Sequence, residues 1–295
     1  MRPELRELTP AEYPARLRDL PKPPERLWVV GALPRGPSVA IVGTRHPSKD
    51  GLAFARRIAK ELAEAGVAIF SGGAEGIDRA AHEGALDAGG VTVVVAPSSF
   101  DEPYPEEHGP LYERIVESGG AFVTSLPPGT KAHTSRFFPR NSQLVALTQA
   151  LLVVETRIIG GSRNAVASAR RLGRPVLVMP GLPWTKETTG CLLELRRGAG
   201  LLTSAKDALA LLGLHRPRRG PGSGPGPEGA TDALDASGPA RARVISLLAR
   251  GPRYPDDLCR EGGVPAAELQ ALLLTLTLEG IVVSGPSGHV LLVTV

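Results

Sequence analysis

The 295-residue sequence contains only two cysteines, Cys191 and Cys259. They lie far apart and share no metal-ligand spacing with the six histidines, so the sequence predicts neither a disulfide framework nor a metal site. No apolar run approaches the roughly 20 residues that cross a bilayer, and the N-terminus lacks an apolar core of signal-peptide length. These absences predict a cytoplasmic protein in a reducing compartment, with no membrane partner.

Positive charge is present but modest. The formal net charge is +4, which favours polyanionic partners because a positive field concentrates phosphate groups near the surface. Many arginine-rich proteins that never bind nucleic acid have a similar balance. Charge alone therefore leaves nucleic-acid binding open.

Between residues 38 and 213, short apolar runs alternate with amphipathic stretches. Runs such as "SVAIVGT", "VTVVVAP" and "ALLVVET" are apolar on both faces, which is typical of parallel strands covered on both sides. Residues 52–66 and 164–173 have helical spacing and end in glycine. This alternation predicts an α/β domain with a doubly wound, mostly parallel sheet. Residues 1–37 are too short and proline-rich for a domain, and we expect them to pack on this core.

The composition changes near residue 214. Residues 214–237 are rich in proline and glycine and lack periodicity, so they read as a linker. In residues 238–295, three helical patterns precede two apolar runs joined by "SGPSG", the order of a winged-helix domain. This segment has five arginines and five acids, and its third helical pattern contains no lysine or arginine. We therefore expect it to bind DNA weakly and to serve as a protein-contact module.

Glycines follow three of the predicted strands. The carboxyl ends of parallel strands meet at one edge of a sheet, where ligands bind. Backbone N–H groups at glycine turns and helix starts can hold a phosphate there. The plainer alternative is that these glycines only permit tight turns, but two glycine loops beside an arginine favour an anion site. The candidate residues are Gly43, Thr44 and Arg45, then Ser71, Gly72, Gly73 and Gly76, then Gly161 and Ser162.

A basic and aromatic segment, "SRFFPRN", precedes a further helical pattern. Cations beside aromatic faces are typical of single-stranded nucleic-acid sites, and here the prediction rests on Arg136, Arg140 and Asn141, because a phenylalanine at such a place is more often core. Asp78 and Glu155 are predicted to be structural or orienting carboxylates. His82 lies one helical turn after Asp78, and we expect the two to meet at the helix surface.

These stretches resemble the DNA-processing protein A (DprA/Smf) family. "SVAIVGTR", "SGGAEGIDRAAHEGALDAGG", "RNSQLVALTQALLVVET" and "GGSRNAVASARRLGRPVLVMPG" follow the family's order, and the resemblance covers roughly residues 10–295. It implies an extended Rossmann-like domain that binds and protects single-stranded DNA and forms a homodimer. It also implies a protein that helps load the RecA recombinase during natural transformation, with no cofactor and no catalytic role.

The resemblance also assigns a DNA-binding pocket. It places there Arg45, residues 71–78, Arg140 with Asn141, and Gly161 with Ser162. The sequence departs from the family at several of these positions. Glu75 and Ser142 stand where the family usually has a basic residue, and Gly73 replaces a leucine. Arg163 replaces an aliphatic residue and can restore part of the lost positive charge.

Two enzyme classes are the alternatives to a DNA-binding protein. Rossmann-like phosphoribohydrolases use a glutamate after a "PGGxGT" loop, whereas this sequence has "IIGGSRNAVAS" with no glutamate in the following turn. A dinucleotide-dependent oxidoreductase needs a GxGxxG turn after the first strand, whereas "GTRHPSKDG" occurs here. The nucleotide-binding hydrolase remains the alternative to a non-enzymatic DNA-binding protein.

Overall fold

The computed structural model describes residues 4–182, 184–214, 239–279, 281–284 and 289–292. It divides into two compact units, residues 1–217 and residues 218–295, and each is described by itself. Apart from residue 214, the expected linker lies outside the described residues, as does the expected wing turn at residues 285–288. No helix in the described part of the chain is long and apolar enough to cross a membrane.

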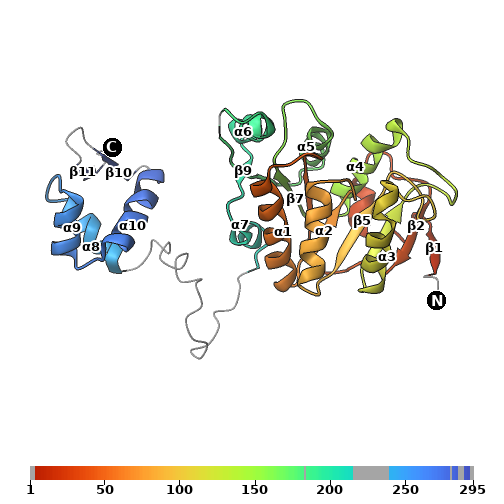
Figure 1. Ribbon diagram of the computed structural model, residues 1–295, viewed down its shortest axis with the longest axis horizontal. Helices are drawn as coiled ribbons and strands as arrows, with labels where there is room; N and C mark the ends of the chain where they lie inside the picture. The colour runs from red at the N-terminus through yellow and green to blue at the C-terminus, as the bar shows by residue number, and fades with distance from the viewer. Residues whose placement is uncertain (1–3, 183, 215–238, 280, 285–288, 293–295) are drawn as a thin grey trace. The chain divides into compact units, whose positions relative to one another are not determined.

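A nine-stranded sheet in the order β1-β2-β6-β5-β4-β3-β7-β8-β9 forms the centre of the first unit (Figure 1). The strands from β6 to β9 in this order are all parallel, while β2 pairs antiparallel with β1 and β6. The chain moves outward from β3 to β6 and then returns to β7, so the order reverses between β3 and β7. The strands are β1 (Leu5–Leu8), β2 (Leu27–Gly31), β3 (Ser38–Gly43), β4 (Ala68–Ser71), β5 (Thr92–Val95), β6 (Ala121–Thr124), β7 (Ala150–Val154), β8 (Val176–Val178) and β9 (Gly200–Leu201).

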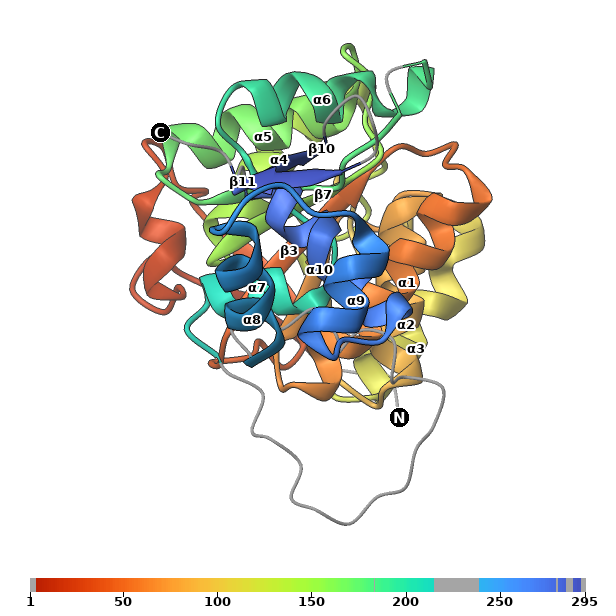
Figure 2. The same ribbon diagram turned by 90° about the vertical axis from the view of Figure 1, so that its left-hand side faces the viewer.

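Helices cover both faces of this sheet, as the continuous apolarity of the strands predicted (Figure 2). Alternate strand residues enter opposite cores: Ile41 packs beneath α1 and α2, and Val42 packs beneath α4 and α5. Helices α1 (Lys49–Glu64), α2 (Ile77–Asp87), α3 (Gly109–Glu117) and α7 (Ala205–Leu211) lie on one face. The 3-10 turn η1 (Ala15–Asp19) and helices α4 (Phe137–Ala146), α5 (Gly161–Arg171) and α6 (Thr189–Arg196) lie on the other; the remaining short turns are η2 (Glu106–His108), η3 (Thr134–Arg136) and η4 (Lys186–Thr188). The doubly wound α/β prediction is confirmed.

The N-terminal segment does more than pack on the core, because part of it joins the sheet. β2 pairs with β6, with Val29 opposite Val123, and β1 adds one more strand outside β2. The prolines between these strands, from Pro10 to Pro24, fall in the connection. They therefore remove no hydrogen bond from the strand ladder.

The second unit has three helices followed by a hairpin, which confirms the winged-helix order. Its elements are α8 (Pro239–Leu248), α9 (Pro255–Gly262), α10 (Ala266–Leu278), β10 (Val282–Ser284) and β11 (Val290–Leu292). Val244, Leu258 and Leu276 are fully buried in its separate core. Its arginines are partly used in ion pairs, such as Arg241 with Glu279 at 2.8 Å.

His82 is completely buried, so the expected surface contact is wrong. The spacing of Asp78 and His82 does place both on one face of α2, but this face packs inward with Ala85. The Thr92 hydroxyl donates to the Ile69 carbonyl oxygen at 2.8 Å, so its oxygen accepts from His82 Nδ1 at 2.7 Å. His82 Nε2 has no partner. Burial lowers the pKa of His82 to about 3.

We expect His82 to make the first unit sensitive to acid. In the unfolded chain a histidine takes up a proton near pH 6.5, whereas in the folded chain His82 stays neutral down to about pH 3. The stability that neutral, buried His82 contributes is therefore fully present above pH 6.5 and is lost as pH falls below that value. By about pH 5 the free energy of unfolding is lower by about 2 kcal/mol. Urea unfolding, followed by the fluorescence of Trp28 and Trp184, measures this loss. His82→Gln should show a smaller decrease between about pH 7 and about pH 5; equal decreases would contradict the assignment.

Candidate nucleic-acid interface

The loops after β3 and β7 meet where the strand order reverses. The Thr44 N–H donates to the Glu155 carbonyl oxygen at 2.8 Å. The buried Glu155 carboxylate accepts from the Ser48 N–H at 2.8 Å and from the Ser48 hydroxyl. Ser48 caps the start of α1, so Glu155 anchors that helix beside the first loop. Gly43 is required by packing, because a Cβ there would lie 2.0 Å from the Val154 carbonyl oxygen.

The glycine loop after β4 already holds an anion supplied by this chain. The N–H groups of Gly72 and Ala74 donate to Asp78 Oδ2 at 3.1 and 3.3 Å. Asp78 is buried, and burial raises the pKa of its carboxyl group, while Arg140 and these N–H groups act in the opposite direction. The geometry is that of an anion nest, but these two donors face a carboxylate inside the protein. These two N–H groups are therefore engaged within the protein, and a phosphate-binding role for the loop stays a prediction.

Arg140 lies in the protein interior rather than at the surface. Its Nη1 donates to the Val95 carbonyl oxygen at 3.0 Å, and only 6% of the residue is exposed. Burial lowers the pKa of Arg140, and the negative charge of Asp78 opposes this shift. A Cβ at position 72 would lie 1.6 Å from Arg140 Nη1, so only glycine leaves room for the guanidinium. The sequence places Arg140 among DNA-contacting residues, whereas the structure shows it compensating the charge of Asp78.

Arg45 remains exposed and lies over an aromatic ring. Its guanidinium carbon is 5.2 Å from the centroid of the Phe137 ring, and that of Arg140 is 5.8 Å from the same centroid. Tyr104 contacts Phe137 edge to face at 5.5 Å. The sequence pattern favoured a core role for the phenylalanines and indicated no role for Tyr104. The adjacent pair in "RFFPRN" was a signal for Phe137, but nothing local indicated that Tyr104 would reach it from the loop after β5.

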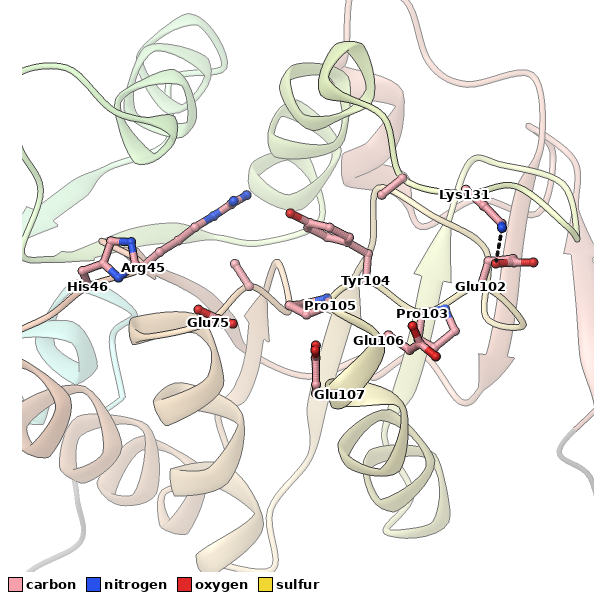
Figure 3. A pocket seen from close by; sticks show the side chains of 12 residues that line it. Arg45, His46, Glu75, Glu102, Pro103, Tyr104, Pro105, Glu106, Glu107 and Lys131 are labelled. Carbon is pink, nitrogen blue, oxygen red and sulfur yellow. Dashed lines mark ion pairs between the residues drawn. The ribbon is translucent and has the colours of Figure 1, made fainter.

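A pocket of about 630 Å³ opens beside Arg45. Figure 3 shows Arg45 and Tyr104 pointing toward one another from opposite sides of it. Glu75, Glu106 and Glu107 also line the pocket, and all three are exposed. Lys131 on the far rim lies 4.0 Å from Glu102. The pocket therefore offers one cation on aromatic rings, with several carboxylates along its wall.

The predicted residues at the start of α5 form a second group. Asn141 Nδ2 donates to the Gly161 carbonyl oxygen at 3.2 Å, which joins α4 to this turn. Gly161 is exposed, and no side chain caps the helix start. The hydroxyls of Ser162 and Thr156 lie 2.6 Å apart. Arg163 pairs with the buried Glu194, and Arg136 donates to the Lys131 carbonyl oxygen, so neither guanidinium is unengaged.

Comparison with known proteins identifies the family. The profile of DNA recombination-mediator protein A matches residues 5–213, and that of the DprA winged helix domain matches residues 228–288. The chain belongs to the DprA/Smf family. It is 37% identical over 274 residues to a Mycobacterium tuberculosis protein named DNA processing protein DprA, covering 90% of this chain and 68% of that protein.

Two solved DprA structures agree with the fold. DprA from Streptococcus pneumoniae has a TM-score of 0.66 and 31% identity, covering 70% of this chain and 74% of that one. DprA from Helicobacter pylori, described with a single-stranded DNA binding mode, has a TM-score of 0.64 and 26% identity, covering 72% of this chain and 98% of that one. The resemblance found in the sequence motifs is confirmed.

The described residues offer few chemical groups for catalysis at this edge of the sheet. No three His, Cys, Asp or Glu side chains of the described part of the chain cluster as a metal site would require. The first turn of α5 contains no acidic residue, so the glutamate that the hydrolase alternative needs is missing at that place. Asp78 and Glu155, the buried carboxylates beside the loops, are both engaged by backbone N–H groups.

Asp78→Ala should destabilise the first unit strongly. The substitution leaves Arg140 buried without a compensating charge and leaves two backbone donors unpaired, so we expect a loss of about 3–5 kcal/mol of unfolding free energy. Asp50→Ala, which removes an exposed first-turn carboxylate of α1, is the matched control and should cost about 0.5 kcal/mol. Denaturant unfolding measures both. The double variant Asp78→Asn/Arg140→Met should recover part of the lost unfolding free energy. Equal losses in Asp78→Ala and Asp50→Ala would refute the pairing of Asp78 with Arg140.

Proposed function

We propose that this protein binds single-stranded DNA at the edge of its sheet where β3, β4, β5 and β7 end. It then protects incoming strands and helps load the RecA recombinase during natural transformation. Family membership and the DNA-binding mode described for the Helicobacter pylori relative support the DNA-processing role. The observation that carries the proposal is the exposed Arg45 over Phe137 at the mouth of the pocket. RecA filament growth on strands precoated with this protein tests the loading step; no acceleration would count against it.

The geometry suits a strand held by its backbone and one or two bases. Arg45 offers a guanidinium to a phosphate, while its contact with Phe137 limits the orientations that it must give up on binding. Tyr104 and Phe137 offer aromatic edges and faces to a base in the pocket. The uncapped N–H groups at the start of α5 can take a further phosphate. None of these contacts needs a covalent step, so the proposed function is binding rather than catalysis.

Arg45→Ala should weaken binding of single strands of any sequence. Loss of one phosphate contact lowers the salt slope of log K by about 0.7, and we expect about a tenfold loss of affinity at moderate salt. Fluorescence anisotropy over a salt series measures both quantities. Arg57→Ala is the matched control, because Arg57 also lies over a phenylalanine ring, Phe54 at 5.5 Å, but on α1.

Glu75→Arg, which replaces a negative charge of the same pocket with a positive one, should tighten binding of the strand. Unchanged affinity in both pocket variants would exclude this pocket.

We further propose that the protein acts as a homodimer through its Rossmann-like domain. Residues 192–202 contain the outer strand β9, whose Leu201 is 57% exposed and whose outer edge is unpaired within the described chain. Two linked sites raise the effective concentration of each for one strand. Sedimentation equilibrium at micromolar concentration should show a dimer, and Leu201→Glu should shift it to monomer. A monomeric wild type would contradict this.

A further inference from the structure

One face of the first unit carries a large surplus of positive charge. Three segments on the α5 and α6 side of the sheet, residues 15–19, 161–174 and 189–197, contain eight arginines and only two acids, Asp19 and Glu194. The formal net charge of these segments, eight arginines minus two acids, is +6, whereas that of the whole chain is only +4. We call these eight residues the basic face: Arg16, Arg18, Arg163, Arg170, Arg171, Arg174, Arg196 and Arg197.

The opposite face shows no such surplus. Helices α1, α2 and α3 together contain six lysines and arginines and eight acids. Many of these charges neutralise one another directly: Arg56 lies 2.6 Å from Asp87, and Arg79 lies 2.8 Å from Glu83. The asymmetry therefore reflects where the arginines are placed and not only the overall composition.

The basic face is structurally organised around one buried carboxylate. Glu194 is 1% exposed, and its oxygens pair with Arg170 at 2.6 Å, with Arg197 at 3.4 Å and with Arg163. Three guanidinium groups around one carboxylate leave a local surplus of two positive charges. The shared partner also restricts the motion of the three side chains, which reduces the entropy lost when they bind an anion.

The placement of α5 connects this face to the proposed DNA site. α5 starts at Gly161, which Asn141 joins to α4, and the helix then runs away from that edge for about 16 Å. Arg163 and Arg170 are separated by about 10 Å along the axis of α5. The three segments contain no aromatic residue, so they offer charged contacts to phosphates rather than stacking contacts to bases.

From this arrangement we infer that the basic face is a second nucleic-acid site, along which a DNA strand held at the Arg45 pocket continues by its phosphates. This inference rests on the proposed function for the first part of the strand. It predicts two contact zones that differ in the length of DNA that they need. A short strand reaches only the pocket, whereas a long strand occupies both.

The test uses the full chain with Arg16→Ala/Arg171→Ala, which leaves the pairs of Glu194 intact and lies outside residues 192–202, the proposed dimer contact. Binding is compared for oligonucleotides of about 6 and about 30 nucleotides over a salt series. We expect the short strand to bind as to wild type. The long strand should bind about tenfold more weakly, with a salt slope lower by about 1.4 for two lost phosphate contacts. Arg57→Ala/Lys60→Ala on α1 removes the same charge from the opposite face and is the control.

Three results would overturn the inference. The long strand could lose no more affinity in the Arg16/Arg171 variant than in the α1 control, or the short strand could lose as much as the long one. Polyglutamate could also displace the long strand as effectively as DNA of equal charge, which would indicate an acidic protein as the partner. Failure of the proposed function gives a different pattern. Arg45→Ala would then leave both lengths unchanged, while the basic-face variant would still weaken the long strand.

Discussion

The electrostatic compensation between Asp78 and Arg140 is the interaction on which the arrangement of the site depends. Both groups are buried, one from α2 and the other from α4, and the loop after β4 lies between them. Asp78 holds that loop through two backbone N–H groups, and Arg140 holds the end of β5 through the Val95 carbonyl oxygen. Burying either charge alone would be strongly unfavourable, so each one stabilises the position of the other. The start of α4 is thereby tied to the sheet, and Phe137 is carried to its place under Arg45.

The glycines of the site are explained mainly by close approach. Gly43 lets β3 approach β7, and Gly72 leaves room for the Arg140 guanidinium. Gly73 has φ +75° and would bring a Cβ within 2.5 Å of the Tyr112 hydroxyl. These glycines permit close packing of the loops against the sheet and its neighbours. The groups that remain exposed to a ligand are Arg45 and the start of α5. Structural roles and the proposed ligand-binding roles are therefore divided between neighbouring residues of the same motifs.

The charges of the first unit follow a similar division. Buried acids organise the arginines: Asp78 with Arg140 at the glycine loop, and Glu194 with three arginines between α5 and α6. In the first case the positive charge of Arg140 is compensated by Asp78 inside the protein. In the second case the arginines outnumber their partner and reach solvent, with Arg170 and Arg197 42% and 52% exposed. The same pairing chemistry thus yields a closed structural contact at one place and a surplus of surface charge at the other.

The sequence by itself determined the α/β class, the positions of the central strands, the winged-helix order and the family. These depend on local patterns: apolar runs, helical spacing, glycine at helix ends and the order of motifs. Only the tertiary structure decided which of the motif residues face solvent and which are buried. Periodicity placed Asp78 and His82 on one face of α2 but could not say that this face packs inward. Likewise, no local signal distinguishes the buried Arg140 from the exposed Arg45, because burial depends on which distant segments, here the ends of β4 and β5, fold against them.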